Sequence, residues 1–280
     1  MFSIVVPVYN DLRNLRLNLA GFLAQRGSVP PYEIILVDNN SMRESPEAAY
    51  VDFVHRLPLL LVRQPMLPHP LALSRARNVG ITLARYPWIV TFDADCVPNP
   101  DYLANLATAA RETPRGMIAG ERIFIDAAGI TEHSVASDPA TLSRATRVAS
   151  PSNYGKVRDR RFPHLEHLNR AEHPWAFMHG GNVAFPRSIA QSAGGYDETF
   201  DGDWGYEDID FAFRALTRGG LEPRYLPGMA AYHLDRPGDT VARRSRKRES
   251  PNWQRIISRI PGFAEFKARQ FASLHIEVSL

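Results

Sequence analysis

Residues 2–111 alternate between short apolar runs and longer amphipathic stretches, and this alternation restricts the possible folds more than any other feature. The apolar runs predict strands over Phe2–Tyr9, Tyr32–Val37, Leu59–Val62 and Trp88–Phe92. The other stretches predict helices over Leu12–Ala24, Ala48–His55, Leu71–Arg85 and Asp101–Arg111. Strands that alternate with helices form right-handed βαβ units. The sequence therefore predicts an α/β fold with a mainly parallel central sheet that is flanked by helices.

Polar segments follow three of these strands, in the stretches "VYND", "VDNNS" and "FDADC". Because ligands of such sheets bind beyond the carboxyl ends of the strands, these segments are expected to converge on one site. The third segment places Asp93 and Asp95 directly after an apolar strand. Unpaired buried carboxylates are costly, so this pair needs water, a cation or a hydrogen-bond network.

The composition is that of a globular protein with a mild basic excess. The 280 residues include 33 Lys and Arg against 30 Asp and Glu, which gives a net charge of +3. This excess suits a small phosphorylated ligand and does not indicate a nucleic-acid partner. The single cysteine, Cys96, rules out an intrachain disulfide and a Cys-based zinc site.

The chain shows no signal-peptide pattern at its start and no apolar run of about 20 residues. We therefore expect a soluble, cytoplasmic protein. The basic run "RRSRKR", Arg243–Arg248, keeps peripheral membrane contact as an alternative. A solvated connector is the simpler interpretation of such a like-charge block.

The second half of the chain is less regular. Ile123–Phe177 has poor periodicity and predicts a long excursion with short helices, one of them over Pro139–Val148. A helix marked by Ile209, Phe211, Phe213 and Leu216 follows, then strand-like "PRYLP" and "AAYHL", and an amphipathic helix over Trp253–Ile260. We divide the chain into residues 1–122, residues 123–240, and a basic connector with a helix over 241–280.

Several polar groups could carry chemistry, although each has a simpler structural explanation. Asp93 and Asp95 offer the hard oxygen ligands that Mg²⁺ and Mn²⁺ prefer, but Asp-x-Asp occurs by chance in many surface loops. Arg77 could bind phosphate or simply face solvent. Glu207 and Asp208 could include a general base or only favour a helix N-terminus. A lone histidine such as His233 is more often structural than a ligand.

Seven motifs in order resemble the inverting glycosyltransferases of family 2, which have the Rossmann-like GT-A nucleotide-sugar fold. They are "VVPVYN", "VDNNS", "ARNVGI", "FDADC", "GGN", "GGYDETF" and "WGYEDIDF". The second half is most similar to the branch that includes bacterial chondroitin polymerase domains and β-1,4-galactosyltransferases. Together the motifs cover most of the chain, from Phe2 to about Leu234.

The resemblance implies that residues 1–122 bind the nucleotide-sugar donor, that residues 123–240 bind the acceptor and carry catalysis, and that each matching residue has a role. Nucleotide-sugar contacts are expected from Pro7, Tyr9, Asp38, Arg77, Asn78, Asp93, Gly181 and Asn182. Asp95, Asp93 and His233 would hold Mn²⁺ or Mg²⁺. Asp208 would be the catalytic base, and Glu207 would contact a sugar. The acceptor would meet Trp204, Gly205 and Tyr206, whose aromatic rings suit the apolar face of a sugar.

The implied activity is the transfer of a sugar from a nucleoside diphosphate, such as a UDP-linked hexose or N-acetylhexosamine. The acceptor would be a hydroxyl of a glycan, a small molecule, a lipid-linked compound or a peptide. A nucleotidyltransferase of the pyrophosphorylase type is a rival, but "PVYNDLRN" lacks the Gly-rich phosphate loop typical of those enzymes. A non-catalytic nucleotide- or glycan-binding protein is a second rival, although its site would not need four intact carboxylates.

Overall fold

A computed structural model of the chain describes residues 1–65, 72–150, 153, 155–161, 164–235 and 250–273. Its centre is a seven-stranded sheet in which β8 runs antiparallel to both of its neighbours and every other pair of adjacent strands is parallel. In spatial order the strands are β3 (Leu59–Arg63), β2 (Tyr32–Asp38), β1 (Phe2–Val8), β4 (Trp88–Phe92), β8 (Asn182–Pro186), β6 (Gly116–Ala119) and β9 (Glu222–Tyr225). The predicted mainly parallel α/β fold is confirmed.

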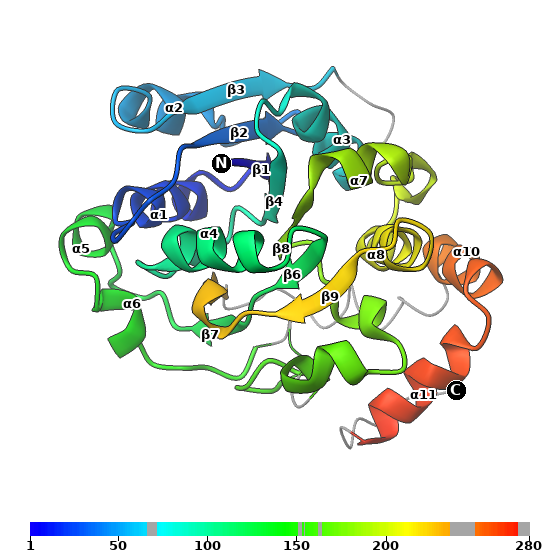
Figure 1. Cartoon of the computed structure of the whole chain (residues 1–280). Helices are drawn as coiled ribbons and strands as arrows, with labels where there is room; N and C mark the ends of the chain where they lie inside the picture. Colours follow the sequence, from blue (N-terminus) through cyan, green and yellow to red (C-terminus); the bar gives the residue numbers. More distant parts are fainter. Residues whose placement is uncertain (66–71, 151–152, 154, 162–163, 236–249, 274–280) are drawn as a thin grey trace.

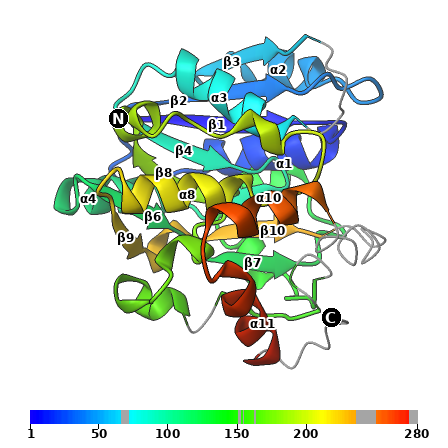
Figure 2. The same ribbon diagram turned by 90° about the vertical axis from the view of Figure 1, so that its right-hand side faces the viewer.

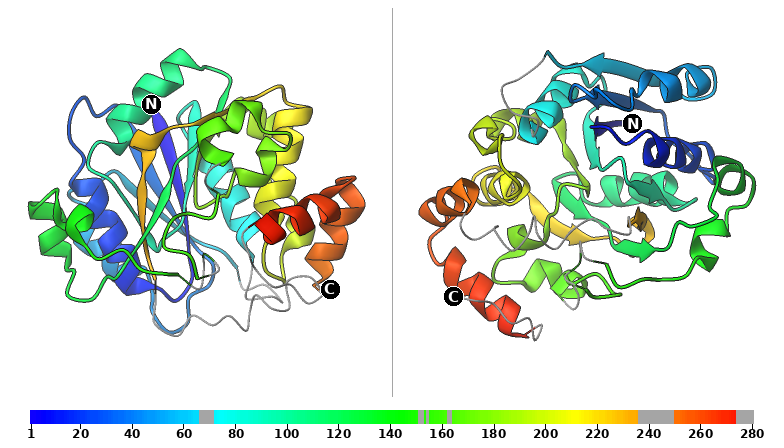
Figure 3. Two further views of the ribbon diagram at one scale, coloured as in Figure 1. Left: turned by 90° about the horizontal axis from the view of Figure 1, so that it is seen from below. Right: turned by 180° about the vertical axis from the view of Figure 1, so that it is seen from behind.

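Helices cover both faces of this sheet (Figures 1 and 3). One face carries α1 (Leu12–Leu23) and α4 (Tyr102–Glu112), and the other carries α3 (Leu73–Leu83), α7 (Arg187–Ser192) and α8 (Glu207–Thr217). Successive residues of a strand point to opposite faces, so Ile4, Val6 and Val8 join one core while Val5 joins the other. Full burial of each such side chain stabilises the fold by about 1.5–3 kcal/mol.

A second, three-stranded sheet lies beside the end of β4. It consists of β5 (Cys96–Pro98), β10 (Ala231–Leu234) and β7 (Arg122–Ile125), with β10 antiparallel to β5 and parallel to β7. The antiparallel register places His233 directly opposite Cys96. This sheet brings the strand-like "AAYHL" segment next to the residues that follow "FDAD", although the paired residues Pro98 and Ala231 are 133 positions apart in the sequence.

The excursion after β7 is mostly irregular, as expected, but its predicted helix is wrong in extent. Only Thr141–Arg144 (α6) is helical, after a short helix α5 (Glu132–Ser137). Beyond it the chain runs alongside β7, because the Asp126 amide donates to the Thr146 carbonyl and the Val148 amide to the Phe124 carbonyl. Two 3₁₀ helices, η2 (His164–Arg170) and η3 (Pro174–Phe177), lead back to β8.

The remaining elements connect or cover the sheet. They are α2 (Glu47–Phe53), η4 (Glu198–Phe200), η5 (Pro227–Met229), α10 (Pro251–Arg259) and α11 (Phe263–Ser273). Helix α10, predicted over Trp253–Ile260, lies beside α8 (Figures 1 and 2). Among the residues that the structure describes, no helix is long and apolar enough to cross a bilayer. The basic run Arg243–Arg248 lies outside the described residues.

Candidate active site

The carboxyl ends of β1, β2 and β4 meet at one edge of the large sheet, as the strand-end motifs predicted. The parallel register pairs Val8 with Asp38, and β4 ends at Phe92, directly before Asp93. Pro7 is half-buried, Tyr9 is exposed, and Asp38 is buried. The Asp38 carboxylate accepts hydrogen bonds from the Ser41 amide at 2.8 Å and from the Arg63 guanidinium at 2.8 Å. Both of its oxygens are therefore held within the protein.

The Arg77 side chain contacts carboxylates of two motifs, Asp93 of "FDADC" and Glu207 of "WGYEDIDF". This side chain is only 2% exposed, and its guanidinium lies 2.8 Å from a Glu207 oxygen and 3.5 Å from an Asp93 oxygen. The ring of Tyr196 lies 5.1 Å from the centre of this guanidinium, which adds a cation–π contact. Burial opposes the charge on Arg77, but Tyr196 and the carboxylates raise its pKa further above the ordinary arginine value. A permanently charged guanidinium thus fixes Asp93 relative to Glu207.

Two consecutive glycines make this close packing possible. A Cβ atom at Gly180 would lie 2.8 Å from the Arg77 guanidinium, and one at Gly181 would lie 2.1 Å from a carboxylate oxygen of Asp93. The Gly181 carbonyl also accepts the Asp93 amide at 3.1 Å. No other residue would fit at Gly181 without displacing Asp93. The "GGN" motif therefore shapes the space around the arginine and the aspartate.

Glu207 and Asp208 start α8 and point to different surroundings. Glu207 is buried against Arg77, whereas Asp208 is partly exposed. One oxygen of Asp208 accepts the Gly180 amide at 3.2 Å, and the other accepts the Ile209 amide at 2.8 Å. Burial and the neighbouring Asp208 raise the pKa of the Glu207 carboxyl, and the charge of Arg77 opposes that shift. Of the two acids, Asp208 is therefore the more accessible to a substrate.

A second group of ligand atoms lies across β5 and β10. Among the described residues, Asp95, Cys96 and His233 have potential metal-binding atoms within 4.8 Å of one another. The His233 Nε2 atom lies 3.5 Å from Asp95, and its Nδ1 atom lies 3.3 Å from Asp235. Burial disfavours the charged imidazole, but Asp95 and Asp235 outweigh it and raise the pKa of His233. Asp93 stands outside this group and pairs with Arg77 instead.

Two asparagines predicted to contact the nucleotide sugar make internal hydrogen bonds. Asn182 is fully buried; it accepts from the Tyr102 hydroxyl at 2.7 Å and donates to the Met229 and Glu121 carbonyls. Asn78 exchanges hydrogen bonds with the Tyr196 backbone, accepting its amide and donating to its carbonyl, each at 2.8 Å. Both side chains hold neighbouring loops in place, and their contact with a ligand stays a prediction.

The three predicted acceptor residues differ sharply in exposure. Trp204 is 44% exposed, whereas the Tyr206 side chain is buried and packs on Trp253 and Phe263. Gly205 has φ of +86° and Tyr206 has φ of +74°, the left-handed region that favours glycine. Of the two aromatic side chains, only that of Trp204 presents a surface to solvent, so Tyr206 acts here as part of the core.

Three further polar residues near the carboxylates escaped sequence reasoning. Arg122, at the start of β7, places its guanidinium 3.0 Å from the Nδ1 atom of His179. Burial opposes its charge, while Asp159, Asp93 and Asp95 raise its pKa. Asp235 lies directly after "AAYHL", and its position two residues after His233 was the only signal in the sequence that could have identified it. Arg122 gave no signal, and scattered histidines such as His179 are usually solvated, so the burial of this one was not expected.

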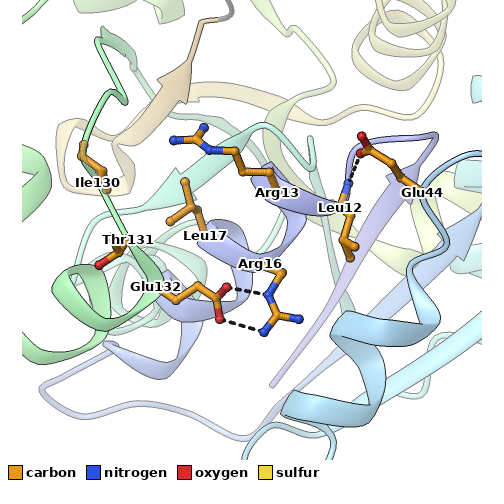
Figure 4. A pocket seen from close by; sticks show the side chains of 8 residues that line it. All are labelled: Leu12, Arg13, Arg16, Leu17, Glu44, Ile130, Thr131 and Glu132. Atoms are coloured by element: carbon orange, nitrogen blue, oxygen red, sulfur yellow. Dashed lines mark hydrogen bonds and ion pairs between the residues drawn. The ribbon is translucent and has the colours of Figure 1, made fainter.

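A cavity of about 510 Å³ lies between α1 and the segment that leads into α5 (Figure 4). None of the predicted site residues lines it. The Glu132 carboxylate binds the Arg16 guanidinium there, and the Glu44 carboxylate accepts the Leu12 amide at 2.9 Å. The charges of Arg16 and Glu132 therefore neutralise each other in the cavity wall. The carboxylates of the candidate site do not line this cavity.

Comparison with known proteins identifies the family. The family model described as glycosyl transferase family 2 matches residues 3–193. The chain belongs to this family. A second model, described as the N-terminal domain of galactosyltransferase, matches residues 160–234. The predicted family 2 membership, and with it the prediction of a glycosyltransferase, is confirmed.

Curated relatives include much longer proteins. The Escherichia coli chondroitin synthase is 30% identical over 245 residues, which cover 84% of this chain and 35% of that protein. The Pasteurella multocida hyaluronan synthase is also 30% identical, over 84% of this chain and 25% of that protein. A validoxylamine A glucosyltransferase of Streptomyces hygroscopicus subsp. limoneus is 28% identical, over 78% and 48%. The chain thus spans a quarter to about half of these relatives.

Solved structures support the GT-A fold. The Pyrobaculum calidifontis mannosyltransferase in complex with GDP-Man and Mn²⁺ has a TM-score of 0.61 at 18% identity, covering 92% of this chain and 64% of that one. Staphylococcus aureus TarS in complex with UDP-GlcNAc has a TM-score of 0.59 at 15% identity, covering 86% and 60%. At this level of identity the similarity concerns the fold alone.

Proposed function

We propose that this family 2 glycosyltransferase moves a hexose or N-acetylhexosamine from a UDP-linked donor to a glycan hydroxyl, with inversion at the anomeric carbon. The observation that carries the proposal is the difference in burial between the Glu207 and Asp208 side chains. Glu207 is buried against Arg77, while Asp208 is partly exposed beside Gly180. The names of the synthase relatives support a glycan acceptor, and the UDP-GlcNAc complex of TarS supports the donor class.

The residues beside β5 and β10 fit a divalent cation. Asp95 offers a carboxylate oxygen and His233 an imidazole nitrogen, a pair that suits Mn²⁺ and, with more water ligands, Mg²⁺. Asp235 lies next to the other imidazole nitrogen, as an outer carboxylate commonly does for a metal-binding histidine. When bound, such a cation would offset negative charge on the leaving diphosphate. Asp93 would then face the donor from its place beside Arg77.

The reaction follows from these positions. Asp208 takes the proton of the acceptor hydroxyl, and the acceptor oxygen attacks the anomeric carbon from the face opposite the nucleotide. The bond between that carbon and the diphosphate oxygen breaks in the same displacement, so no enzyme nucleophile is required. Arg77 remains charged throughout and keeps Asp93 and Glu207 in place. The exposed Trp204 offers an apolar face to the acceptor sugar.

Replacement of Asp208 tests the assignment of the base. Asp208→Asn keeps the shape of the side chain and removes its basicity, so turnover should fall by about 10² or more while UDP affinity stays nearly unchanged. Transfer can be followed with Mn²⁺ and a panel of UDP-sugars, and the anomeric configuration of the product can be read by NMR. Glu207→Gln is the matched control, and it should reduce stability as well as activity because it weakens the contact with Arg77.

Three results would contradict the proposal. If Asp208→Asn turned over normally and Glu207→Gln lost only activity, the two roles would be reversed. A product that retained the donor's anomeric configuration would rule out a single displacement. If Asp95→Ala bound Mn²⁺, measured by electron paramagnetic resonance, as tightly as the unaltered protein does, the cation would have to bind elsewhere.

A further inference from the structure

Helix α10 contacts the loop that leads into the catalytic helix, although it lies beyond both family models, which end at residues 193 and 234. The loop comprises residues 200–206 and is called here the 200–206 loop. Asn252, in the first turn of α10, is 1% exposed. Its side-chain amide donates to the Phe200 carbonyl at 2.8 Å and to the Gly205 carbonyl at 3.1 Å. A single side chain therefore ties both ends of the loop together.

The backbone of this loop needs such support. Gly202, Gly205 and Tyr206 all have positive φ, of +97°, +86° and +74°. A tyrosine in the left-handed region is strained, and such a conformation persists only when surrounding contacts enforce it. Asp208 follows Tyr206 by two residues, so the direction of its side chain depends on this turn.

Other contacts join α10 to the same region. The Tyr206 ring packs on Trp253 of α10, with ring centroids 5.6 Å apart, and Arg259 at the end of α10 binds Asp210 of α8 at 3.0 Å. The Asn252 oxygen accepts from the Arg255 guanidinium at 2.7 Å, which fixes the orientation of its amide. Figures 1 and 2 show α10 beside α8. Of these α10 side chains, Asn252 is the one that hydrogen-bonds to the backbone of the 200–206 loop.

We propose that Asn252 is a positioning residue for the transfer reaction. By holding the Phe200 and Gly205 carbonyls it keeps the turn at Gly205 and Tyr206 in the geometry that presents Asp208 to the acceptor. The inference rests on the proposed function, because it assigns Asn252 an effect through the base. It extends the catalytic apparatus to a helix outside the region that both family models match.

Asn252→Asp separates this role from the stability of α10. The aspartate has nearly the same shape and can still accept from Arg255, but it cannot donate to the two carbonyls. At the second helical position an acidic residue favours the helix itself, so α10 should remain folded. A displaced base slows the reaction steeply, so kcat should fall by about 10². The donor KM and the UDP dissociation constant should stay within about twofold, since the proposed function puts the donor beside Asp93 and Arg77, and the hydrogen bonds of Asn252 go to Phe200, Gly205 and Arg255 instead.

Asn105→Asp is the matched control. Asn105 also donates its side-chain amide to a glycine carbonyl, that of Gly228 at 3.0 Å, but it lies on α4. We expect it to leave kcat unchanged even if it lowers the melting temperature. Combining Asn252→Asp with Asp208→Asn should give no lower turnover than Asp208→Asn alone, because one change acts through the other.

Unchanged kcat in Asn252→Asp would overturn the proposal. So would a loss of kcat that fully adds to that of Asp208→Asn, or one that merely follows a lowered melting temperature as in the control. The proposed function fails by a different result, namely an active Asp208→Asn variant. The two hypotheses can therefore be rejected separately.

Discussion

Residues 1–122 and residues 123–235 contribute to the same sheet but are stabilised in different ways. In the first part, β1 and β2 are seven residues long and are lined almost entirely by buried aliphatic side chains. In the second part the strands have four or five residues, 3₁₀ helices interrupt the chain, and charged side chains such as Asp159 and Arg161 are buried outside helices and strands. Apolar burial needs only the right pattern, whereas buried charge needs a specific partner at a specific place.

The clearest example in the second part is the ion pair of Asp159 and Arg161. Both side chains are almost fully buried, 2.6 Å apart, and the guanidinium also donates to the Gly120 and Phe177 carbonyls. Burial would raise the pKa of Asp159, but Arg161 outweighs it and holds that pKa well below the usual range. Such a network tolerates little change, because removal of one partner leaves the other charged and buried. Buried charge thus holds the irregular part of the predicted acceptor region, next to an apolar core that includes Trp175 and Phe177.

Arg77 spans the two parts, and its loss should have the largest effect. Arg77→Met keeps the bulk of the side chain but leaves Glu207 and Asp93 without their buried counter-charge. Removal of one member of a buried pair typically costs about 3–5 kcal/mol, so unfolding by urea should shift to much lower concentration. UDP binding and transfer should also fail. The site is therefore expected not to form when the two parts lose this connection.

An exposed ion pair supplies the control for that experiment. Arg26 makes a two-pronged contact with Asp101, but both side chains are about half exposed. Arg26→Ala should therefore shift the urea midpoint far less than Arg77→Met, since solvent already screens the pair. Equal shifts for the two variants would show that Arg77 is no more than an ordinary surface contact.

The sequence predicted the first part well because its signals are local. The strands β1 to β4 and the helices between them follow from periodicity, and Arg77, Asp93, Glu207 and Asp208 lie together as the motifs implied. The second part depends on partners that are distant in sequence. Strands β8 and β10 are short and pair with distant segments, His233 with Cys96 at a separation of 137 residues, and nothing local predicts this pairing.

The side-chain environments could not be predicted for the same reason. "GGN" identified Asn182, but only the fold shows that Tyr102, from α4, donates to its oxygen. "WGYED" suggested that Tyr206 faces a sugar, whereas α10 packs on its ring from a segment some 45 residues further along the chain. A motif thus located each residue without indicating whether its side chain faces the ligand or the core.

Replacement of Asn182 should lower stability by an intermediate amount, and it tests whether this side chain faces the donor or the core. Asn182→Ala removes three hydrogen bonds and leaves the buried Tyr102 hydroxyl and the Met229 carbonyl without these partners, while the Glu121 carbonyl still accepts the Ala231 amide. Each unsatisfied buried group costs about 1–3 kcal/mol, so stability should fall by at least that amount. UDP affinity, measured by calorimetry below the unfolding transition, should change little. A large loss of UDP affinity at normal stability would instead identify Asn182 as a direct ligand of the donor.

The smallest expected effect is on the free energy of unfolding, which should depend on pH through His179 in the second part. His179 is buried, and its Nδ1 atom accepts a hydrogen bond from Arg122 at 3.0 Å, so the imidazole is neutral. Burial, together with the cations Arg122, Arg160, Arg161 and Lys267, lowers the pKa of His179 well below 6.5. The unfolded chain therefore binds a proton below about pH 6.5 that the folded chain does not. This contribution to stability is fully present above that pH and is lost as the pH falls.

The His179→Asn variant isolates that contribution, because an asparagine oxygen can replace Nδ1 as the acceptor but does not titrate. The free energy of unfolding should be measured for both proteins between pH 8 and pH 5.5. Relative to the variant, the unaltered protein should lose about 1.4 kcal/mol by pH 5.5, the free energy of protonating a histidine of ordinary pKa in the unfolded chain. A difference that stayed constant with pH would mean that His179 binds its proton equally in both states. The hydrogen bond from Arg122 would then be lost at low pH, because a protonated imidazole has no lone pair on Nδ1 to accept it.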